Sequence, residues 1–465
     1  MNGLFFDAIE THDPAAREAA LMAALPAQVR AAQSTAAMGA VLAGVDADAI
    51  TSRAALARLP VTRKSELLER QRASIAVDPF GGFSALGWRA LPRARPAQRV
   101  FQSPGPIYEP ESATRDYWRM ARALFAAGLR EGDLAHNCFS YHLTPGGLMM
   151  ESGALALGCT VFPGGVGNTE LQLQAMAELK PEAYIGTPSF LKILVDKAAE
   201  TGASIASVKK ALVSGEAFPP SLRDWLQQRG ISAFQCYATA DLGLIAYETS
   251  AREGLVQDEG VIVEIVRPGT GDPVPEGDVG EVVVTTLNAD YPLIRFGTGD
   301  LSAVLPGRCP TGRTNTRIKG WLGRADQTAK VRGMFVHASQ IAEVVKRHPE
   351  LLRARLVVEG EMAEDRMTLF AEITQGDPQG LAERVAGTLR DITKLRGAVT
   401  FKRPGELAND RMTLRVEAAS TAQALADVVA SSVRDLTKLR CDVVLSPPGS
   451  LPNDGLVIED ARKYT

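Results

Sequence analysis

Hydrophobic residues change their spacing several times along the chain, and these changes divide it into segments. Residues 7–75 are rich in alanine and repeat apolar positions at helical spacing, which predicts a helical N-terminal region. Residues 76–100 contain a Gly-Gly pair and several prolines, which predicts a loop. From about 101 to 305, short apolar runs alternate with amphipathic stretches, a pattern typical of a parallel sheet with crossover helices.

Within the alternating region, separate runs predict individual elements. The expected strands cover 135–139, 159–162, 183–185 and 210–213, and the expected helices cover 114–127, 170–179 and 188–201. Residues 260–305 differ, because β-branched runs are separated there by turns of Gly, Pro and Asp. The runs at 260–266, 280–287 and 301–305 predict a small antiparallel or barrel-like part.

The last part of the chain carries an internal repeat. Asp-Arg-Met-Thr-Leu occurs at 365–369 and again at 410–414, and two further short motifs recur with it. Each unit is predicted to form a strand, a helix and a strand. We therefore expect an α/β protein with a large N-terminal domain and a smaller, mobile α+β C-terminal domain. The expected bounds are 1–325 for the first domain (helical start 1–75, α/β core 101–259, β-rich part 260–322) and 326–465 for the second, with repeats at about 361–405 and 406–450.

Composition narrows the class of protein. A chain of 465 residues is too long for one ordinary core, and 45% hydrophobic with 23% charged residues is usual for a globular protein. The net charge of −3 gives no electrostatic reason to expect nucleic acid or a membrane surface as a partner. The start lacks a signal-peptide pattern, which favours the cytoplasm. The five cysteines are scattered and odd in number, which argues against a disulfide framework.

Two neighbouring motifs carry most of the chemical information. Residues 292–301 read Pro-Leu-Ile-Arg-Phe-Gly-Thr-Gly-Asp-Leu and place Asp300 after a glycine-relaxed turn at the end of an apolar run. A carboxylate held there can accept hydrogen bonds from two adjacent ribose hydroxyls. Residues 323–334 then place Arg324 and Asp326 at the expected domain junction, before a basic strand. Upstream, Ser-Gly-Glu at 214–216 follows an apolar run, where α/β sheets commonly bind ligands.

In this order, the motifs resemble those of the AMP-forming acyl-CoA ligases, and the segment 330–341 looks most like the phenylacetate-CoA ligase branch. The resemblance implies that Asp300 and Arg324 bind the ribose of ATP and that Asp326 is a hinge. It also implies an adenine loop and a Tyr-Gly-x-Thr-Glu-like element with adenine-stacking, phosphate-binding and magnesium-binding roles. The loop is Ser214, Gly215 and Glu216, and the element is Tyr237, Ala238, Thr239 and Asp241, with Asp241 as the Mg²⁺ ligand.

Two positions depart from the family's pattern. Ser103 and Gly105 are what is left of the phosphate loop, which here contains three prolines that lack N–H donors and is followed by no lysine. Glu109, in the same loop, is expected to repel phosphate unless magnesium intervenes. Leu456 occupies the place where the resemblance implies the catalytic lysine of adenylation.

The remaining assignments concern the other two substrates. The segment 136–147 resembles the family's acid site, and the candidates are Phe139, Tyr141, His142, Gly146 and Gly147. An aromatic wall suits phenylacetate, whereas Tyr141 or His142 could instead bind a 2-hydroxy group. The CoA phosphates are assigned to Lys330, Arg332 and Gly333, although a solvated basic strand edge explains these residues equally well.

The expected function is therefore that of an ATP-dependent carboxylic acid:CoA ligase. ATP and either an aryl-acetic acid or a small acid, such as a 2-hydroxy acid, would give an acyl-adenylate and pyrophosphate, and CoA would then displace AMP. ATP, Mg²⁺ and coenzyme A are the implied cofactors, and a homodimer is compatible with the resemblance. Two alternatives stay open: transfer of the acyl group to an acceptor other than CoA, and a nucleotide-binding relative impaired in catalysis.

Overall fold

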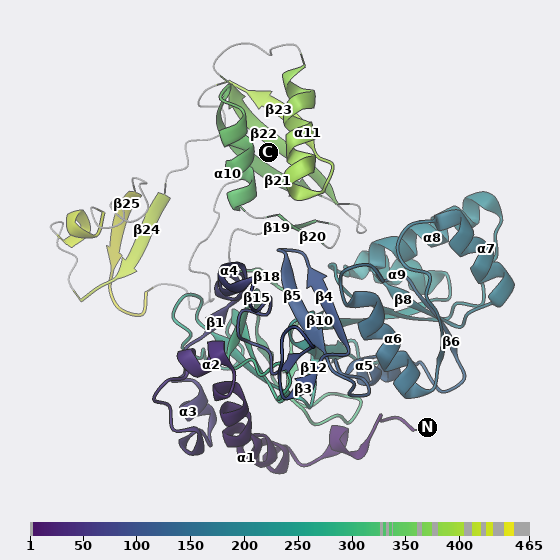
Figure 1. Cartoon of the computed structure of the whole chain (residues 1–465). Coiled ribbons are helices and arrows are strands. Elements are labelled where there is room, and N and C mark those ends of the chain that lie inside the picture. Colours follow the sequence, from purple (N-terminus) through teal and green to yellow (C-terminus); the bar gives the residue numbers. More distant parts are fainter. Residues whose placement is uncertain are drawn as a thin grey trace. The chain divides into compact units, whose positions relative to one another are not determined.

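The computed structural model describes residues 3–325, 329–331, 334–336, 338–359, 365–373, 380–403, 412–419, 425–430 and 441–450. These residues separate into two compact units, one holding those up to Phe335 and the other those from Val336 onward (Figure 1). Among the residues so described, none of the helices combines the length and apolar character needed to cross a bilayer.

The N-terminal region is helical, as predicted. Its elements are η1 (Ala8–Thr11), α1 (Pro14–Gln33), α2 (Ala36–Val41), η2 (Ala47–Ala49), α3 (Arg53–Leu56) and α4 (Lys64–Ser74). The side chain of Asp13 caps α1 by accepting a hydrogen bond from the backbone N–H of Ala16. Leu25 and Val29 of α1 are fully buried in a core shared with the sheet that contains Val263. The helices thus pack against the β-rich part of the same unit.

A nine-stranded mixed sheet forms the centre of this unit, in the order β16-β17-β12-β11-β10-β9-β8-β6-β7. Its strands are β6 (Leu134–Asn137), β7 (Thr160–Phe162), β8 (Ala183–Gly186), β9 (Lys210–Val213), β10 (Ser232–Thr239), β11 (Gly243–Glu248), β12 (Leu255–Gln257), β16 (Val304–Leu305) and β17 (Arg317–Ile318). The strands from β7 to β10 pair in parallel, as the alternating pattern predicted, and those from β10 to β16 pair antiparallel.

Helices cover both faces of the parallel part (Figure 1). They are α5 (Met120–Ala126), α6 (Gly146–Leu157), α7 (Thr169–Leu179), α8 (Pro188–Thr201) and α9 (Pro220–Gln228). Because successive strand residues point to opposite faces, Leu212 joins the core under α5 and α6, whereas Ala211 and Val213 join the core under α7, α8 and α9. Four strands and two helices thus lie close to their predicted ranges.

The predicted helix 114–127 begins only at Met120. Asp116 and Arg119 have positive φ angles of 50° and 63°, so the chain turns before the helix starts. The Asp116 carboxylate then accepts hydrogen bonds from the backbone N–H groups of Met120 and Ala121, at 2.8 and 2.9 Å. The turn and this cap explain the late start.

A second sheet has the order β1-β15-β14-β13, with β18 added beside β15. The strands are β1 (Thr62–Arg63), β13 (Val261–Val266), β14 (Gly280–Thr286), β15 (Phe296–Ser302) and β18 (Gly323–Arg324). The prediction of a glycine-relaxed turn before Asp300 was wrong, because Asp300 lies inside β15. The predicted strand 301–305 is likewise divided between β15 and β16, which belong to different sheets. Pairing with β1, β14 and β18 outweighs the turn preference of the glycines.

The described residues up to Val336 also hold three two-stranded sheets, and the first of them is parallel. They are β2 (Leu86–Gly87) with β3 (Arg95–Pro96), β4 (Arg99–Ser103) with β5 (Ile107–Glu111), and β19 (Ala329–Val331) with β20 (Met334–Val336). The first pair lies within the predicted loop 76–100. The second is a tight antiparallel hairpin at the place of the expected phosphate loop.

The C-terminal unit contains two strand–helix–strand segments. Its elements are α10 (Ala338–Arg347), β21 (Leu351–Glu359), β22 (Arg366–Ile373), α11 (Leu381–Thr393), β23 (Ala398–Lys402), β24 (Met412–Glu417) and β25 (Cys441–Ser446), and residues 425–430 are helical. Strand β22 pairs in parallel with β23, and β24 with β25. Thr368 lies opposite Ala398, and Thr413, its counterpart in the sequence repeat, lies opposite Asp442. The two segments therefore share one register.

Candidate active site

Asp300 is the centre of a hydrogen-bonded cluster from three separate segments. The Tyr237 hydroxyl donates to Oδ2 of Asp300 at 2.8 Å. Nη1 of Arg324 and Nε1 of Trp321 both donate to Oδ1 at 3.0 Å. Strand β18 pairs with β15 so that Arg324 lies directly opposite Asp300. The structure therefore brings together three residues that the sequence assigned to the nucleotide, and it adds Trp321, which the sequence analysis missed.

Gly299 allows the arginine to approach. This residue has a φ of 73°, and a Cβ atom placed on it would lie 2.4 Å from Nη2 of Arg324. A side chain at this position would therefore push the guanidinium away from Asp300.

Asp241 lies in the turn after β10, and its partner is a lysine far away in the sequence. Its side chain is 1% exposed, and Oδ2 accepts a hydrogen bond from Nζ of Lys64 at 2.9 Å. Oδ1 is buried and finds no hydrogen-bond partner among the residues that the structure describes. Burial opposes the charge on Lys64, but the carboxylates of Asp241 and Glu109 outweigh it and raise the lysine pKa. The ammonium group is thus held charged beside Asp241.

Pairing of β1 with β15 explains how Lys64 reaches this position. Thr62 and Arg63 lie opposite Phe296 and Gly297, and Lys64 then begins α4. The guanidinium of Arg63 forms an ion pair with Glu281, which also accepts a hydrogen bond from the Gly299 N–H at 3.2 Å. Lys64 lies in the segment Leu-Pro-Val-Thr-Arg-Lys-Ser at 59–65, and the sequence analysis did not assign it to the site.

The place of the expected phosphate loop is a closed hairpin turn. Ser103 pairs with Ile107, so only three residues connect β4 and β5. The Ser103 hydroxyl donates to Oε1 of Glu109, and the Ser103 N–H donates to Oε2 at 3.3 Å. Burial, and then the charge of Asp241, raise the pKa of Glu109 to about 8. Gly105 leaves room in the turn, since a Cβ there would lie 2.9 Å from Cγ1 of Ile107.

The other predicted nucleotide residues lie at the ends of β9 and β10. Gly215 has a φ of 86°, and the Ser214 hydroxyl donates to the carbonyl of Cys236 at 2.9 Å. Glu216 accepts a hydrogen bond from the backbone N–H of Ser189 at 3.4 Å, at the start of α8. The register of β10 shifts between Tyr237 and Ala238, and the Thr239 hydroxyl then accepts from the N–H of Leu242 at 3.1 Å.

The predicted acid-site residues surround the start of α6. A Cβ atom on Gly146 or on Gly215 would lie 3.6 Å from the ring of Phe139, which places this ring beside both glycines. The Tyr141 hydroxyl donates to Glu151 and accepts from Asn137, both at 2.8 Å. Gly147 admits no side chain, since a Cβ would meet the carbonyl of Ser140 at 2.7 Å. His142 is exposed.

Several predicted residues fall outside this description. Asp326, Arg332, Gly333 and Leu456 are not among the residues that the structure describes, and of Lys330 only its place in β19 is given. Their assignments stay predictions.

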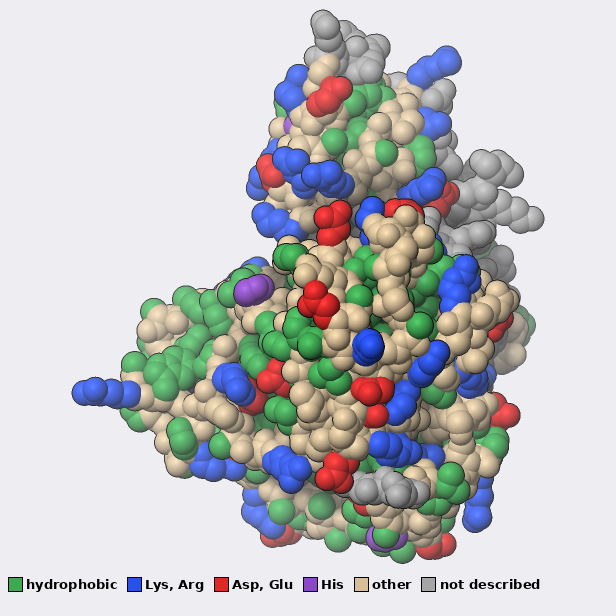
Figure 2. Space-filling view, turned by 90° about the vertical axis from the view of Figure 1, so that its right-hand side faces the viewer, with side chains coloured by type: hydrophobic (Ala, Val, Ile, Leu, Met, Phe, Trp, Pro, Cys, Tyr) green, Lys and Arg blue, Asp and Glu red, His purple; other side chains and the backbone are tan. Residues whose placement is uncertain are grey.

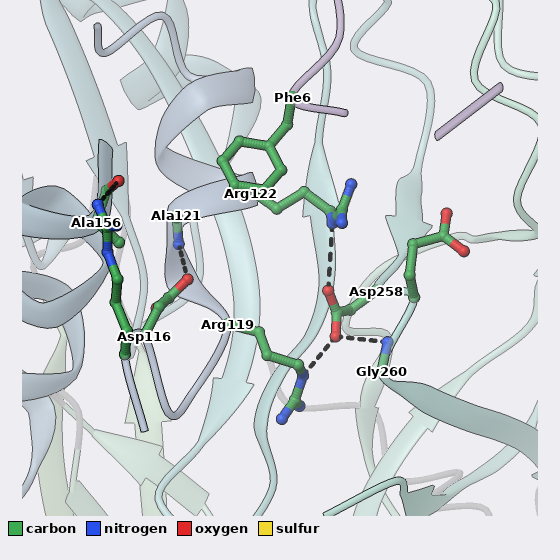
Figure 3. Close-up of a pocket in the computed structure, with 10 residues that line it drawn as sticks. Phe6, Asp116, Arg119, Ala121, Arg122, Ala156, Asp258 and Gly260 are labelled. Atoms are coloured by element: carbon green, nitrogen blue, oxygen red, sulfur yellow. Dashed lines mark hydrogen bonds and ion pairs between the residues drawn. The ribbon is translucent and has the colours of Figure 1, made fainter. Parts of the chain in front are cut away.

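A separate cavity of about 480 Å³ lies elsewhere in the N-terminal unit (Figure 3). Asp258 points into it and pairs with Nε of Arg119 at 2.6 Å and with Nε of Arg122 at 3.6 Å. Arg122 also lies over the ring of Phe6 at 5.0 Å. The charges that line this cavity therefore neutralise one another, and none of the residues predicted from the sequence contributes to it.

Comparison with known proteins decides the class. The sequence model of the family described as AMP-binding enzyme matches residues 113–288. The chain is 31% identical to a phenylacetate-coenzyme A ligase of Thermus thermophilus over 78% of this chain and 86% of the relative. It is 32% identical to one of Aromatoleum evansii over 71% and 75%.

The chain belongs to the phenylacetate-coenzyme A ligase family. It is accordingly an acid–thiol ligase of the AMP-forming class, as the sequence predicted. Its fold matches that of a 2-hydroxyisobutyryl-CoA ligase, with a TM-score of 0.75 at 23% identity over 91% of this chain and 94% of the other. The predicted α/β fold class is thereby confirmed.

The surface of this ligase carries both kinds of charge. On the face shown in Figure 2, Lys and Arg side chains are interspersed with Asp and Glu, which agrees with the net charge of −3. No carboxylate-rich or cysteine-rich group of three or more metal-ligating side chains occurs in the parts of the chain that the structure places. The orphaned Oδ1 of Asp241 nevertheless fits Mg²⁺, because this ion prefers hard oxygen ligands and completes its shell with water and phosphate.

Proposed function

We propose that this ligase activates an arylacetic acid with ATP and transfers the acyl group to coenzyme A. The carboxylate oxygen attacks the α-phosphorus of ATP and releases pyrophosphate, and the CoA thiol then attacks the acyl carbon and releases AMP. The main support for the proposed nucleotide site is the hydrogen-bonded cluster of Tyr237, Asp300 and Arg324, which come from three separate strands.

Asp300 would bind the ribose. A carboxylate has about four lone-pair directions, and three donors already occupy Asp300. Trp321 is 47% exposed, so its indole N–H is the donor that a ribose hydroxyl replaces most easily. Burial, and then the charge of Asp300, raise the pKa of Tyr237 far above its ordinary value, so its hydroxyl stays a donor. Gly215 and its neighbours Ser214 and Glu216 would line the adenine.

Lys64 would supply the positive charge that the proline-containing loop at 102–110 lacks. Its side chain is 37% exposed although its ammonium group contacts Asp241, so it can turn from the carboxylate toward a phosphate. Asp241 would hold Mg²⁺ through Oδ1, and the ion would neutralise part of the phosphate charge when bound. Lys64, and the Mg²⁺ that Asp241 would hold, would then stabilise the negative charge that develops on the α-phosphate during adenylation.

The acid is proposed to be aromatic. The relatives at 31% and 32% identity are phenylacetate-coenzyme A ligases, and the ring of Phe139 lies beside Gly146 and Gly215. The similar solved structure holds a 2-hydroxyisobutyryl adenylate and CoA, which keeps a small 2-hydroxy acid as the second candidate. We favour the aromatic acid, because the Tyr141 hydroxyl is already engaged on both sides and offers no free donor.

The C-terminal part is proposed to act as a lid. Asp326 would be its hinge, and Lys330, Arg332 and Gly333 would contact the CoA phosphates. We also propose a cytoplasmic location and a homodimer, which is compatible with the family resemblance, and sedimentation velocity of the purified chain measures its assembly.

Pyrophosphate release tests the proposal. The chain and its Leu456→Lys variant are incubated with ATP, Mg²⁺ and, in turn, phenylacetate, benzoate, a 2-hydroxy acid and a short fatty acid. We expect release with phenylacetate. A rise in the lysine variant identifies position 456 as the missing cation, whereas equal rates favour Lys64. No release with any acid, together with no ATP binding in calorimetry, refutes the proposal.

A further inference from the structure

The β4–β5 hairpin holds an acidic side chain against its own hydrogen-bond donors. Ser103 and Glu109 lie on neighbouring strands, and both are buried. Both carboxyl oxygens of Glu109 are engaged by Ser103, one by the hydroxyl and one by the backbone N–H. These donors are of the kind that bind phosphate oxygens in nucleotide sites. In this protein the carboxyl group of Glu109 accepts the hydrogen bonds from both of these donors.

The groups around Glu109 make a negative charge on its carboxyl group energetically unfavourable. Lys64 faces Glu109 from α4, Asp241 faces it from the turn after β10, and the Tyr291 phenol is also close enough to interact. Lys64 pairs directly with Asp241, so two carboxyl groups lie near one ammonium group. Burying a charge without a full partner destabilises a protein. Glu109 is therefore poorly explained as a stabilising residue, and its place beside the proposed nucleotide site indicates a functional role.

We propose that Glu109 is a built-in competitor for nucleotide phosphate, an inference that rests on the nucleotide site proposed above. A phosphate oxygen is an acceptor like a carboxylate oxygen, so a polyphosphate can take over the donors of Ser103 only by displacing Glu109. The displaced carboxylate then faces the phosphate and Asp241 without its partners. Glu109 thereby lowers the affinity for phosphate-bearing nucleotides and leaves the affinity for adenosine unaffected.

Replacing the side chain should reveal the competition. Glu109→Ala frees both donors of Ser103, and one net hydrogen bond gained by ATP lowers its dissociation constant about tenfold. Adenosine, which has no phosphate, should bind equally to both proteins. Glu111→Ala is the matched control, because Glu111 is a buried glutamate of the same strand whose partner is Arg99. This variant should bind ATP like the unchanged chain.

The experiment is isothermal titration of the full chain and the variants with ATP and with adenosine. It is run in EDTA, so that no metal ion contributes, and at pH 9, above the pKa of Glu109 of about 8. Tighter ATP binding by Glu109→Ala with unchanged adenosine binding supports the inference. Unchanged or weaker ATP binding overturns it and leaves Glu109 as a brace of the hairpin.

Two further outcomes, failure of the variant to fold and failure of the proposed nucleotide site, can be distinguished from each other. If Glu109→Ala does not fold, the isosteric Glu109→Gln decides: it removes the charge, so tighter ATP binding is expected, and equal or weaker binding overturns the inference. If neither the unchanged chain nor any variant binds ATP with or without Mg²⁺, the proposed nucleotide site itself fails. That result differs from ATP binding that is insensitive to Glu109, which overturns only the role of this residue.

Discussion

Arg295 holds the segment that carries Lys64, and its replacement should unfold much of the N-terminal unit. The side chain is 2% exposed, and Nε pairs with Glu264 at 3.0 Å. Its two terminal nitrogens donate to the carbonyls of Ala57 at 2.8 Å, Leu59 at 2.5 Å and Gly271 at 2.6 Å. One guanidinium therefore joins the end of the N-terminal helices to the second sheet.

The loss of unfolding free energy in Arg295→Met can be worked out from the buried groups that lose their partner. A buried carboxylate without its partner, here Glu264, costs about 3–5 kcal/mol. Each carbonyl that loses its donor adds about 1 kcal/mol. Glu264 can take up a proton, since burial already raises its pKa, which limits the first contribution. We expect a loss of at least about 5 kcal/mol, comparable with the whole stability of many domains.

Guanidinium denaturation followed by circular dichroism measures this loss. Arg30→Met is the control, because its ion pair with Asp48 is exposed on both sides and should contribute at most about 1 kcal/mol. Adding Glu264→Leu to Arg295→Met should recover part of the stability by removing the orphaned charge. A loss below about 1 kcal/mol for Arg295→Met, or a double variant no more stable than the single one, would refute the reasoning.

Three shorter predictions concern the site. Lys64→Met should lower kcat/KM for ATP about 10–100-fold, which corresponds to the loss of one charge-assisted hydrogen bond. Lys197→Met, on the surface of α8, should leave kcat/KM unchanged. Equal kcat/KM values for Lys64→Met and the unchanged chain in steady-state assays would contradict a phosphate-binding role of Lys64. ATP should change tryptophan fluorescence by displacing Trp321 from Asp300, and a full signal in Trp321→Phe would show that another tryptophan reports binding. Gly147→Ala should raise KM for the acid at least tenfold or destabilise the chain, because the added Cβ lies within 3 Å of neighbouring atoms. A variant with unchanged kinetics and unchanged stability would contradict the close packing around Gly147.

Local sequence signals identified part of the proposed nucleotide site. Asp300, Arg324 and Tyr237 each lie in a short motif whose residue types suit a nucleotide, and the structure brings their side chains within hydrogen-bond distance. The parallel strands around Val213 were predictable for a similar reason: each is a short apolar run bounded by turn residues.

Contacts between distant segments could not be predicted in this way. Lys64 and Asp241 are 177 residues apart, and the start of α4, which carries Lys64, is positioned by the pairing of β1 with β15. Asp300 was placed after a turn because Gly297 and Gly299 disfavour strands, but three neighbouring strands impose the extended conformation. The engagement of Glu109 by Ser103 depends on the hairpin register, which a proline-rich loop does not reveal.

The most direct test of the central claim is the product balance of the complete reaction. The purified chain is incubated with phenylacetate, ATP, Mg²⁺ and coenzyme A, and the products are quantified by liquid chromatography and mass spectrometry. The account predicts AMP and phenylacetyl-CoA in equal amounts, with neither product when CoA and the acid are both left out. AMP without a thioester would indicate another acyl acceptor, and formation of ADP, or no consumption of ATP with any acid tried, would contradict the assignment as an AMP-forming ligase.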